Sequence, residues 1–322
     1  MKILSLFDGI ACGRVAFERM GINVEEYYAY EIDKYAIQIA KKNHPDIKEC
    51  GDVFNADYSN YKNIDWLIGG SPCTFWSIAQ TTQKRETKPE GFGWNLFSQY
   101  LRAIKEAKPK YFLYENNKSM SKDIKNCITE NFGFEPILIN SALVSAQSRQ
   151  RLYWVGERQQ DGTYKQVKVA QPKDKKIILK DILESGITYQ DKNYCLTARY
   201  DGAVFWNTVQ RKQKTMVLEP VRIGQIGKGG QGSRIYSVKG KSITLSASSG
   251  GHGAATGLYK IDVPDGEYVV RKLTPVEAER LQTLPDDYTK GVSNTQRYKG
   301  IGNGWTVDVI CHLISETLKN NA

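Results

Sequence analysis

The stretch GGSPCTFWS, residues 69–77, places a cysteine directly behind a proline. It follows IDWLIGG, an apolar run typical of a buried strand. Most buried cysteines are inert hydrophobic side chains, but a proline-fixed turn after a strand favours a presented thiol at Cys73. A thiolate there can add to an electron-poor carbon if a carboxylic acid protonates the substrate. Glu115, in the run YFLYENN, is placed for that proton transfer; the plainer alternative is a capping or surface carboxylate.

The stretch QSRQR, residues 147–151, puts Arg149 and Arg151 on one side of an extended segment. Two planar guanidinium groups can hold a carbonyl oxygen and a phosphate. Ordinary surface arginines explain most such pairs. The order of this pair, behind the cysteine and the glutamate, favours a place in the same site.

A loop FDGIACG follows the first apolar run, and the acidic Glu31 stands about 20 positions on, as in nucleotide-binding folds. The spacing departs from GxGxxG, and Asp8 would repel a pyrophosphate. A cofactor with ribose and adenine but no phosphate fits better, and S-adenosylmethionine is the common one. Glu31 would accept from the ribose hydroxyls, and Asp52 would read the adenine amino group between Val53 and Ile32.

The elements that must position these residues alternate from residue 2 to about 157. We expect buried strands in KILSLF, EYYAYEI, DWLIGG, YFLYEN, PILINSAL and RLYWVG. Helical spacing appears between them in KYAIQIAKKN, LFSQYLRAIKEA and SKDIKNCITENF. The alternation predicts an α/β fold with a doubly wound, Rossmann-like, mostly parallel sheet. The loops named above, and the turn GDV at residues 51–53, would then meet at one rim of this sheet.

The alternation fades between about 160 and 270, where short β-like runs and glycine turns dominate. YCLTARYDGA and SITLSASSGG read as two versions of one strand and turn. RKLTPVEAERLQTLPDDY predicts a helix with Thr274 as cap and Pro275 in its first turn. The segment IGNGWTVDVICHLISETL begins with a glycine-containing loop and continues as a helix. We expect this helix to return to the first domain. The predicted organisation is one domain of residues 1–160 plus 290–322 and a smaller, mostly β domain with a hinge, residues 161–289.

The net charge of +10 is unevenly distributed over the 322 residues. Residues 191–260 contain 11 Lys and Arg against 3 Asp and Glu. Residues 221–260 contain ten of the 28 glycines and no acidic residue. A basic, glycine-rich surface with interleaved aromatic residues suits a polyanion approached closely by backbone, although a solvated basic face is the simpler alternative.

Other classes of protein fit the composition poorly. Six cysteines without a CxxC pair, and three histidines, argue against a zinc site or a disulfide framework, and we expect no metal. No apolar run approaches the roughly 18 residues of a membrane helix. The N-terminus reads as a first strand and not as a secretion signal, so we expect a cytoplasmic protein.

Eight segments in this order resemble the motifs of the cytosine-C5 DNA methyltransferases over nearly the whole chain. They are SLFDGIACG, YEID, GDV, GGSPCTFWS, YENN, SAQSRQRLYW, RKLTPVEAERLQTLPDDY and IGNGWTVDV. SLFDGIA and GGSPC also look like the animal de novo members, while YCLTARYDGA and YSVKGKSITLSASSGG resemble bacterial and phage enzymes with short target-recognition regions. The resemblance implies the methyltransferase fold, with residues 161–289 as the target-recognition domain.

The resemblance also assigns roles. It makes Cys73 the nucleophile at C6 of a flipped-out cytosine and Glu115 the acid at N3, with Arg149 and Arg151 holding the base and its neighbourhood and Gln147 in support. S-adenosylmethionine would donate the methyl group and leave as S-adenosylhomocysteine. The cofactor contacts implied are Phe7, Asp8, Gly9, Ile10, Glu31, Ile32, Asp52, Val53, Pro72, Leu96, Asn303, Gly304 and Trp305. The expected DNA contacts are Ser77, Arg199, Tyr200, Arg222, Lys228, Arg234, Lys241, Ser246 and Ser248.

The chain departs from the family pattern at several positions, none of which removes a catalytic group. Ala11 and Cys12 stand where many relatives have two glycines, Thr74 replaces a common glutamine, Asn117 a valine, and Gly304 a serine. These departures bear on rate and cofactor affinity more than on reaction type.

The sequence is compatible with several alternatives. An RNA cytosine-C5 methyltransferase and a catalytically silent DNA-binding regulator could share the fold, and a nicotinamide oxidoreductase is disfavoured by the loop spacing. The long basic segment favours double-stranded DNA as the partner. We expect a monomer in a bacterial or phage-infected cell. The recognition sequence and the presence of a cognate restriction endonuclease are left open.

Overall fold

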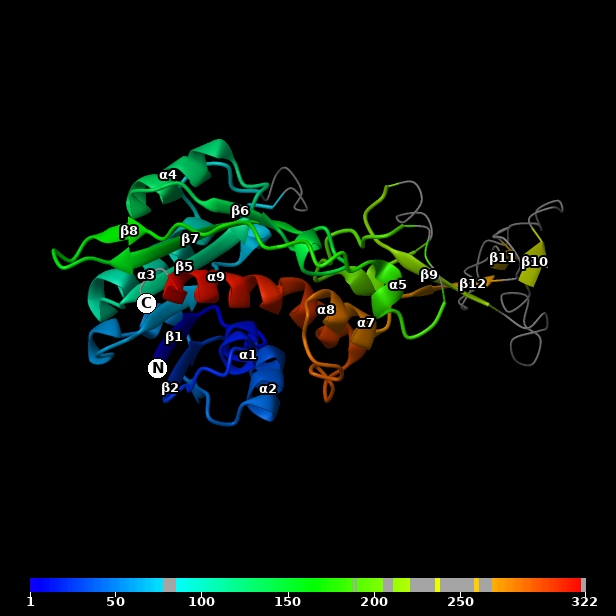
Figure 1. Ribbon diagram of the computed structural model, residues 1–322, viewed down its shortest axis with the longest axis horizontal. Coiled ribbons are helices and arrows are strands. Elements are labelled where there is room, and N and C mark those ends of the chain that lie inside the picture. Colours follow the sequence, from blue (N-terminus) through cyan, green and yellow to red (C-terminus); the bar gives the residue numbers. More distant parts are fainter. Residues whose placement is uncertain are drawn as a thin grey trace.

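The computed structural model describes residues 1–77, 85–186, 188, 190–204, 211–220, 235–237, 258–260 and 268–319. An eight-stranded sheet forms the centre of its larger part (Figure 1). The strands are β1 (Lys2–Leu6), β2 (Glu26–Tyr30), β3 (Lys48–Glu49), β4 (Trp66–Gly69), β5 (Tyr111–Asn117), β6 (Ile137–Asn140), β7 (Gln150–Arg158) and β8 (Tyr164–Gln166).

The strand order is β3-β2-β1-β4-β5-β7-β6, with β8 paired to β7. The first five of these strands run parallel, and β7 is antiparallel to its neighbours β5 and β6. Every residue of β4 and β5 is buried, as expected for parallel strands covered on both faces. The mostly parallel α/β sheet predicted from the sequence is confirmed.

Helices cover both faces of the sheet. One core contains the apolar residues of α1 (Cys12–Arg19), α2 (Lys34–Asn43) and α9 (Val307–Lys319); the other contains those of α3 (Phe92–Ala107) and α4 (Lys122–Phe132). The predicted return of the C-terminal helix is confirmed, because α9 packs against α1. Short 3-10 turns fill the loops: η1 (Val53–Asn55), η2 (Tyr58–Asn60), η3 (Cys73–Phe75), η4 (Ser141–Leu143) and η5 (Tyr200–Gly202).

A third core lies between this sheet and the strands at the far end of the molecule (Figure 1). It includes residues of α5 (Leu179–Ile182), α7 (Pro275–Leu281) and α8 (Asn294–Asn303). Beyond it, β9 (Met216–Pro220) pairs antiparallel with β12 (Tyr268–Lys272), and β10 (Ile235–Ser237) pairs with β11 (Leu258–Lys260). Thr274 caps α7 and Pro275 begins it, as predicted, but the helix ends at Leu281.

The proposed domain limits stay predictions. β8 carries the large sheet as far as residue 166, and Ile301 of α8 packs into the third core. One local expectation was wrong: the segment YCLTARYDGA forms η5 and contains no strand. The N–H and C=O of Leu196 are bonded to the side chains of Gln147 and Arg149, which take the place of a neighbouring strand. SITLSASSGG lies outside the described residues.

Among the described residues, no helix combines the length and the apolar character that crossing a membrane requires.

Candidate active site

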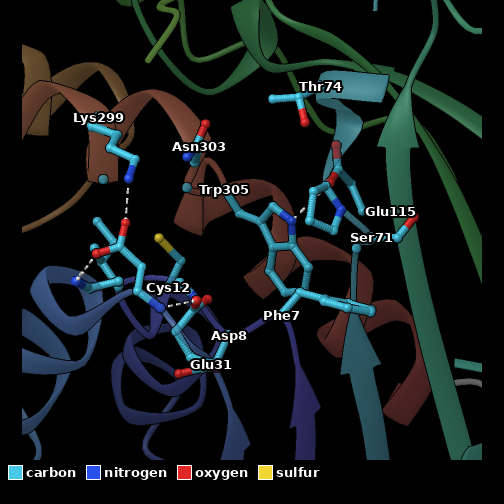
Figure 2. A pocket seen from close by; sticks show the side chains of 18 of the residues that line it. Phe7, Asp8, Cys12, Glu31, Ser71, Thr74, Glu115, Lys299, Asn303 and Trp305 are labelled. Carbon is cyan, nitrogen blue, oxygen red and sulfur yellow. Dashed lines mark hydrogen bonds and ion pairs between the residues drawn. The ribbon is translucent and has the colours of Figure 1, made fainter. Parts of the chain in front are cut away.

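A cavity of about 180 Å³ opens at the carboxyl ends of β1, β2, β4 and β5. Figure 2 shows side chains from these strand ends and from the C-terminal segment around it. Nine of the thirteen predicted cofactor contacts line it, namely Phe7, Asp8, Gly9, Ile10, Glu31, Pro72, Asn303, Gly304 and Trp305. The rim predicted from the strand order is therefore the place where these residues meet.

The loop after β1 turns sharply, with left-handed φ angles of 58° at Phe7, 61° at Gly9 and 62° at Ala11. A side chain at Gly9 would meet no atom within 4 Å, so the backbone there faces open space. This conformation suits glycine and leaves room for a ligand against the main chain.

Asp8 lines this cavity with a carboxylate that is only partly satisfied. Oδ1 accepts from the hydroxyls of Ser5 and Tyr27, both at 2.6 Å. Oδ2 is buried and has no hydrogen-bond partner among the described residues. Burial raises the pKa of Asp8 to about 6, against the effect of the two hydroxyls. A carboxylate oxygen in this condition suits a cationic ligand, and a sulfonium compound is one.

Glu31 is fixed by backbone amides. Its Oε2 accepts from the N–H of Gly9 at 2.8 Å, and its Oε1 accepts from the N–H groups of Ile32 and Asp33, also at 2.8 Å. The carboxylate therefore ties the β1 loop to the end of β2. Its predicted contact with ribose hydroxyls remains a prediction.

Four predicted cofactor contacts do not line the cavity. Ile32 is 74% exposed, and Asp52 accepts from the N–H of Phe54 at the start of η1. Val53 and Leu96 are buried in the second core. A bound ligand larger than the cavity would extend past its rim and could reach these residues. Their roles in cofactor binding therefore stay predictions.

The loop that carries Cys73 is drawn tightly against β5. A Cβ on Gly69 would lie 2.7 Å from the carbonyl oxygen of Leu6, and one on Gly70 would lie 2.8 Å from both the carbonyl oxygen and Oε2 of Glu115. Two glycines are thus required by close approach, and Gly70 lets the loop pass directly beside Glu115.

Hydrogen bonds from β5 hold the same loop in place. Ser71 shares a 2.6 Å hydrogen bond with the hydroxyl of Tyr114, and Asn116 donates to its carbonyl oxygen at 3.1 Å. Cys73 begins η3, and its chain neighbours Pro72 and Thr74 line the cavity. The loop backbone therefore brings position 73 to the rim where Glu115 lies.

Glu115 is 9% exposed, and both of its oxygens accept from named donors. Arg151 Nε lies 3.0 Å from Oε1. Trp305 Nε1 lies 2.9 Å from Oε2, and Figure 2 shows this contact. Arg151 comes from β7, the strand next to β5, whereas Trp305 comes from the loop before α9. The acid predicted from the sequence and one of the two arginines are thus brought together.

Arg149 has a different environment from Arg151. It is 5% exposed and donates to the carbonyl oxygens of Leu196 at 2.9 Å, Gly304 at 3.0 Å and Gly302 at 3.2 Å. It joins the segment before η5 to the loop that carries Trp305. Its predicted contact with a base or phosphate stays a prediction.

Gln147 acts beside Arg149 in the same junction. It is fully buried, accepts from the N–H of Leu196 at 2.6 Å and donates to the carbonyl oxygen of Leu281 at 3.2 Å. The sequence did not indicate this bridging role, because it depends on residues more than 40 positions away.

Comparison of this sequence with known proteins identifies its family. The model of the C-5 cytosine-specific DNA methylases matches residues 1–319. This chain belongs to that family. It is 31% identical to the type II methyltransferase M.HhaI of Haemophilus parahaemolyticus over 97% of this chain and 93% of the relative. It is also 31% identical to M1.ScrFI of Lactococcus lactis subsp. cremoris, over 98% of this chain and 77% of the relative.

The fold comparison agrees with the family. The solved structure of the Entamoeba histolytica methyltransferase EhMeth matches with a TM-score of 0.66 at 14% identity, covering 100% of this chain and 99% of that one. The resemblance predicted from the eight motifs is confirmed, and the chain is a cytosine-C5 DNA methyltransferase.

The predicted DNA contacts of this methylase differ in their exposure to solvent. Arg199 is exposed and Ser77 is half-buried. Tyr200 is 1% exposed, with its hydroxyl donating to the carbonyl oxygen of Thr215 and accepting from the N–H of Leu273. Tyr200 therefore packs inside the third core, and its predicted contact with DNA stays a prediction. The other six predicted contacts, Arg222, Lys228, Arg234, Lys241, Ser246 and Ser248, lie outside the described residues.

Helix α8 supplies one wall of the methylase cavity, and sequence reasoning found only Asn303 of it. Gln296, Lys299 and Gly300 also line the cavity, and Lys299, labelled in Figure 2, forms a 2.5 Å ion pair with Asp33. Helix α8 has few apolar positions, and Asp33, the partner of Lys299, lies 266 residues earlier in the chain. No local sequence signal therefore pointed to these cavity residues.

A second missed residue is Cys195. Its sulfur accepts from Arg149 Nη1 at 3.6 Å and from Arg151 Nη2 at 3.8 Å. Burial works to raise the pKa of this thiol, but the two guanidinium groups outweigh burial and lower it. No motif in the amino-acid sequence indicated this contact between Cys195 and the two arginines.

We expect Gly302→Ala to damage the contact between α8 and the segment before η5. A Cβ there would lie 2.4 Å from the backbone N of Ala198 and 2.4 Å from the backbone carbon of Thr197, so main chain must move. The expected loss in the free energy of unfolding is about 1–3 kcal/mol, measured by urea titration. Gly202→Ala is the control, because its Cβ would meet only the end of Lys214 at 3.4 Å, and it should change stability by less than about 0.5 kcal/mol. Equal stability of the two variants would contradict the close contact.

Proposed function

We propose that this methyltransferase acts on a cytosine rotated out of duplex DNA, through a transient bond between Cys73 and C6 of the base, with S-adenosylmethionine as the methyl donor. The observation that carries the proposal is the meeting of three parts at one rim. They are the loop of Cys73, the carboxylate of Glu115 with its two donors, and the cavity with the unpartnered oxygen of Asp8.

The residues around the cavity fit such a donor. The open backbone at Gly9 can approach it closely, Asp8 supplies a carboxylate oxygen for its positive charge, and Trp305 supplies an aromatic wall. When bound, S-adenosylmethionine supplies the methyl group.

The chain's own residues activate the base. Cytosine C5 is a poor nucleophile, but addition of the Cys73 thiolate to C6, with protonation of N3 by Glu115, converts C5 into an enamine carbon. Arg151 holds the carboxylate through its Nε. After C5 has gained the methyl group, loss of the C5 proton to a base, expulsion of the thiolate and return of the N3 proton to Glu115 regenerate the aromatic ring and the free cysteine.

Base rotation follows from the direction of attack. The thiolate must approach C6 from above the ring plane, and stacking blocks that approach within a duplex. Unstacking costs on the order of a few kcal/mol, which new protein contacts must offset. The basic segment 191–260 is suited to supply phosphate contacts.

Methyl transfer to defined substrates tests this function. The purified protein would be incubated with labelled S-adenosylmethionine and either duplex DNA or RNA, and the DNA of an expressing host would be sequenced after bisulfite treatment. We expect label in DNA and 5-methylcytosine in one fixed sequence context. Label in RNA with none in DNA would favour the RNA enzyme, and label in neither would favour a silent DNA-binding regulator. A restriction endonuclease partner and a monomeric state also remain predictions.

The affinity for the cationic donor is expected to depend on the ionisation of Asp8. A carboxyl with a pKa of about 6 is charged above that pH and neutral below it. Binding should therefore weaken as the pH falls through about 6, by up to about tenfold between pH 7 and pH 5, as measured by calorimetry. Asp8→Asn should bind weakly at every pH in this range.

Glu49 provides the control for this titration. Burial raises its pKa to about 7, but it does not line the cavity. Glu49→Gln should keep the pH dependence, and loss of that dependence in Glu49→Gln but not in Asp8→Asn would contradict the role of Asp8.

A further inference from the structure

Trp305 belongs to two parts of the site at once. Its indole lines the cavity together with Phe7 and Asp8, and its N–H donates to Oε2 of Glu115 at 2.9 Å (Figure 2). The other oxygen of Glu115 accepts from Arg151. The two donors therefore hold opposite sides of one carboxylate, with Gly70 packed beside it.

The main chain beside Trp305 is itself fixed. The carbonyl oxygen of Gly304 accepts from Arg149 Nη2 at 3.0 Å and from Gln282 Nε2 at 3.2 Å. The N–H of Val307 donates to the carbonyl oxygen of Gln282 at 2.9 Å. The loop thus presents the indole from a position held by two buried side chains.

A carboxylate held by a single donor can still turn about its last torsion, because that torsion has a broad energy profile. A second donor on the other oxygen fixes the plane of the group. Hydrogen bonds to a charged acceptor are stronger than those between neutral groups, so this restraint is substantial. An acid must be held within about 3 Å of the atom that it protonates.

We propose that Trp305 is a positioning residue for Glu115, and that its N–H holds the carboxylate in the orientation in which it serves N3 of the target base. This inference rests on the proposed function and goes beyond a role as a wall of the donor pocket. One indole therefore contacts both the donor pocket and the carboxylate of Glu115.

A reaction that needs no methyl donor separates the two roles. When the thiolate adds to C6 and N3 is protonated, the enamine carbon C5 can take a proton from water. Loss of the original C5 hydrogen as a proton, followed by expulsion of the thiolate and return of the N3 proton, restores cytosine. DNA labelled with tritium at C5 therefore releases tritium to water, by a route that uses Cys73 and Glu115 without the donor.

The experiment compares wild type with Trp305→Phe, which keeps an aromatic ring and removes the N–H. We expect tritium release without donor to slow by about tenfold, since a hydrogen bond to a charged group is lost. Donor affinity, measured by calorimetry, should stay within about threefold because the ring is retained. A thermal unfolding curve and the retained donor binding verify that the variant is folded.

Two further variants decide how Trp305 acts. Trp154→Phe removes another indole N–H, which donates to Thr129 at 3.4 Å within the second core, and should release tritium at the wild-type rate. In a Glu115→Ala background, measured with excess enzyme, Trp305→Phe should cause no further loss, because residues that act through one group are not additive.

Tritium release at the wild-type rate in Trp305→Phe would overturn the proposal, as would a full additional loss in the Glu115→Ala background. Failure of the proposed function looks different, since wild type would then neither release tritium nor methylate DNA.

Discussion

Replacing Cys73 with alanine or serine is expected to lower methyl transfer by at least about a thousandfold, because no other group in the account bonds to C6. The loop around position 73 is held by its glycines and by Ser71, so neither replacement should disturb it. Duplex binding should stay within about threefold of wild type, because phosphate contacts supply most of the affinity.

The measurement is a single-turnover methyl-transfer rate beside a binding titration on the same duplex. Cys127→Ser is the matched control, since that thiol lies half-buried on α4 and does not line the cavity, and it should retain full activity. Full methylation by Cys73→Ala would show that Cys73 is not the nucleophile.

The second large effect is expected from Glu115→Gln, which keeps the shape of the side chain and removes its acid. General acid catalysis contributes about a hundredfold to ten-thousandfold, and the single-turnover rate should fall within that range. An amide also has one acceptor oxygen for two donors, so either Arg151 or Trp305 would face an NH₂ group.

The control is Glu130→Gln, an exposed carboxylate on α4, which should leave the rate unchanged. A wild-type rate in Glu115→Gln, with the variant shown to be folded, would mean that N3 is protonated by another group.

The sequence could predict the sheet and its rim for a physical reason. Buried parallel strands such as KILSLF and DWLIGG are continuous apolar runs, and the helices between them repeat every three or four residues. The rim follows from parallel topology, since loops at the carboxyl ends must gather at one edge. The helix α7 was found because its cap and its first-turn proline are local signals.

What the sequence could not predict depends on contacts between distant residues. Arg149 and Arg151 stand two positions apart in one extended segment, yet one is buried among backbone carbonyls and the other faces Glu115. Lys299 reaches the cavity from a helix with a weak apolar pattern. Such side-chain bonds have no period and no fixed spacing, so a pattern of residues cannot reveal them.

A similar limit applies to Tyr200. As an aromatic residue in a basic segment it fits a nucleic acid surface, and its burial became clear only from the third core. The sequence shows which residue types are available, and packing decides which of them reach solvent.

Trapping on a duplex that carries 5-fluorocytosine at the target position tests whether Cys73 forms the bond to C6. Fluorine replaces the C5 hydrogen that must leave as a proton, so the thiolate cannot be expelled after methylation and the protein stays bonded to the base. With S-adenosylmethionine present, we predict a stable protein and DNA adduct whose peptide, identified by mass spectrometry, contains Cys73. An enzyme that methylates the unmodified duplex but forms no adduct, or one bonded through a different residue such as Cys195, would contradict the account.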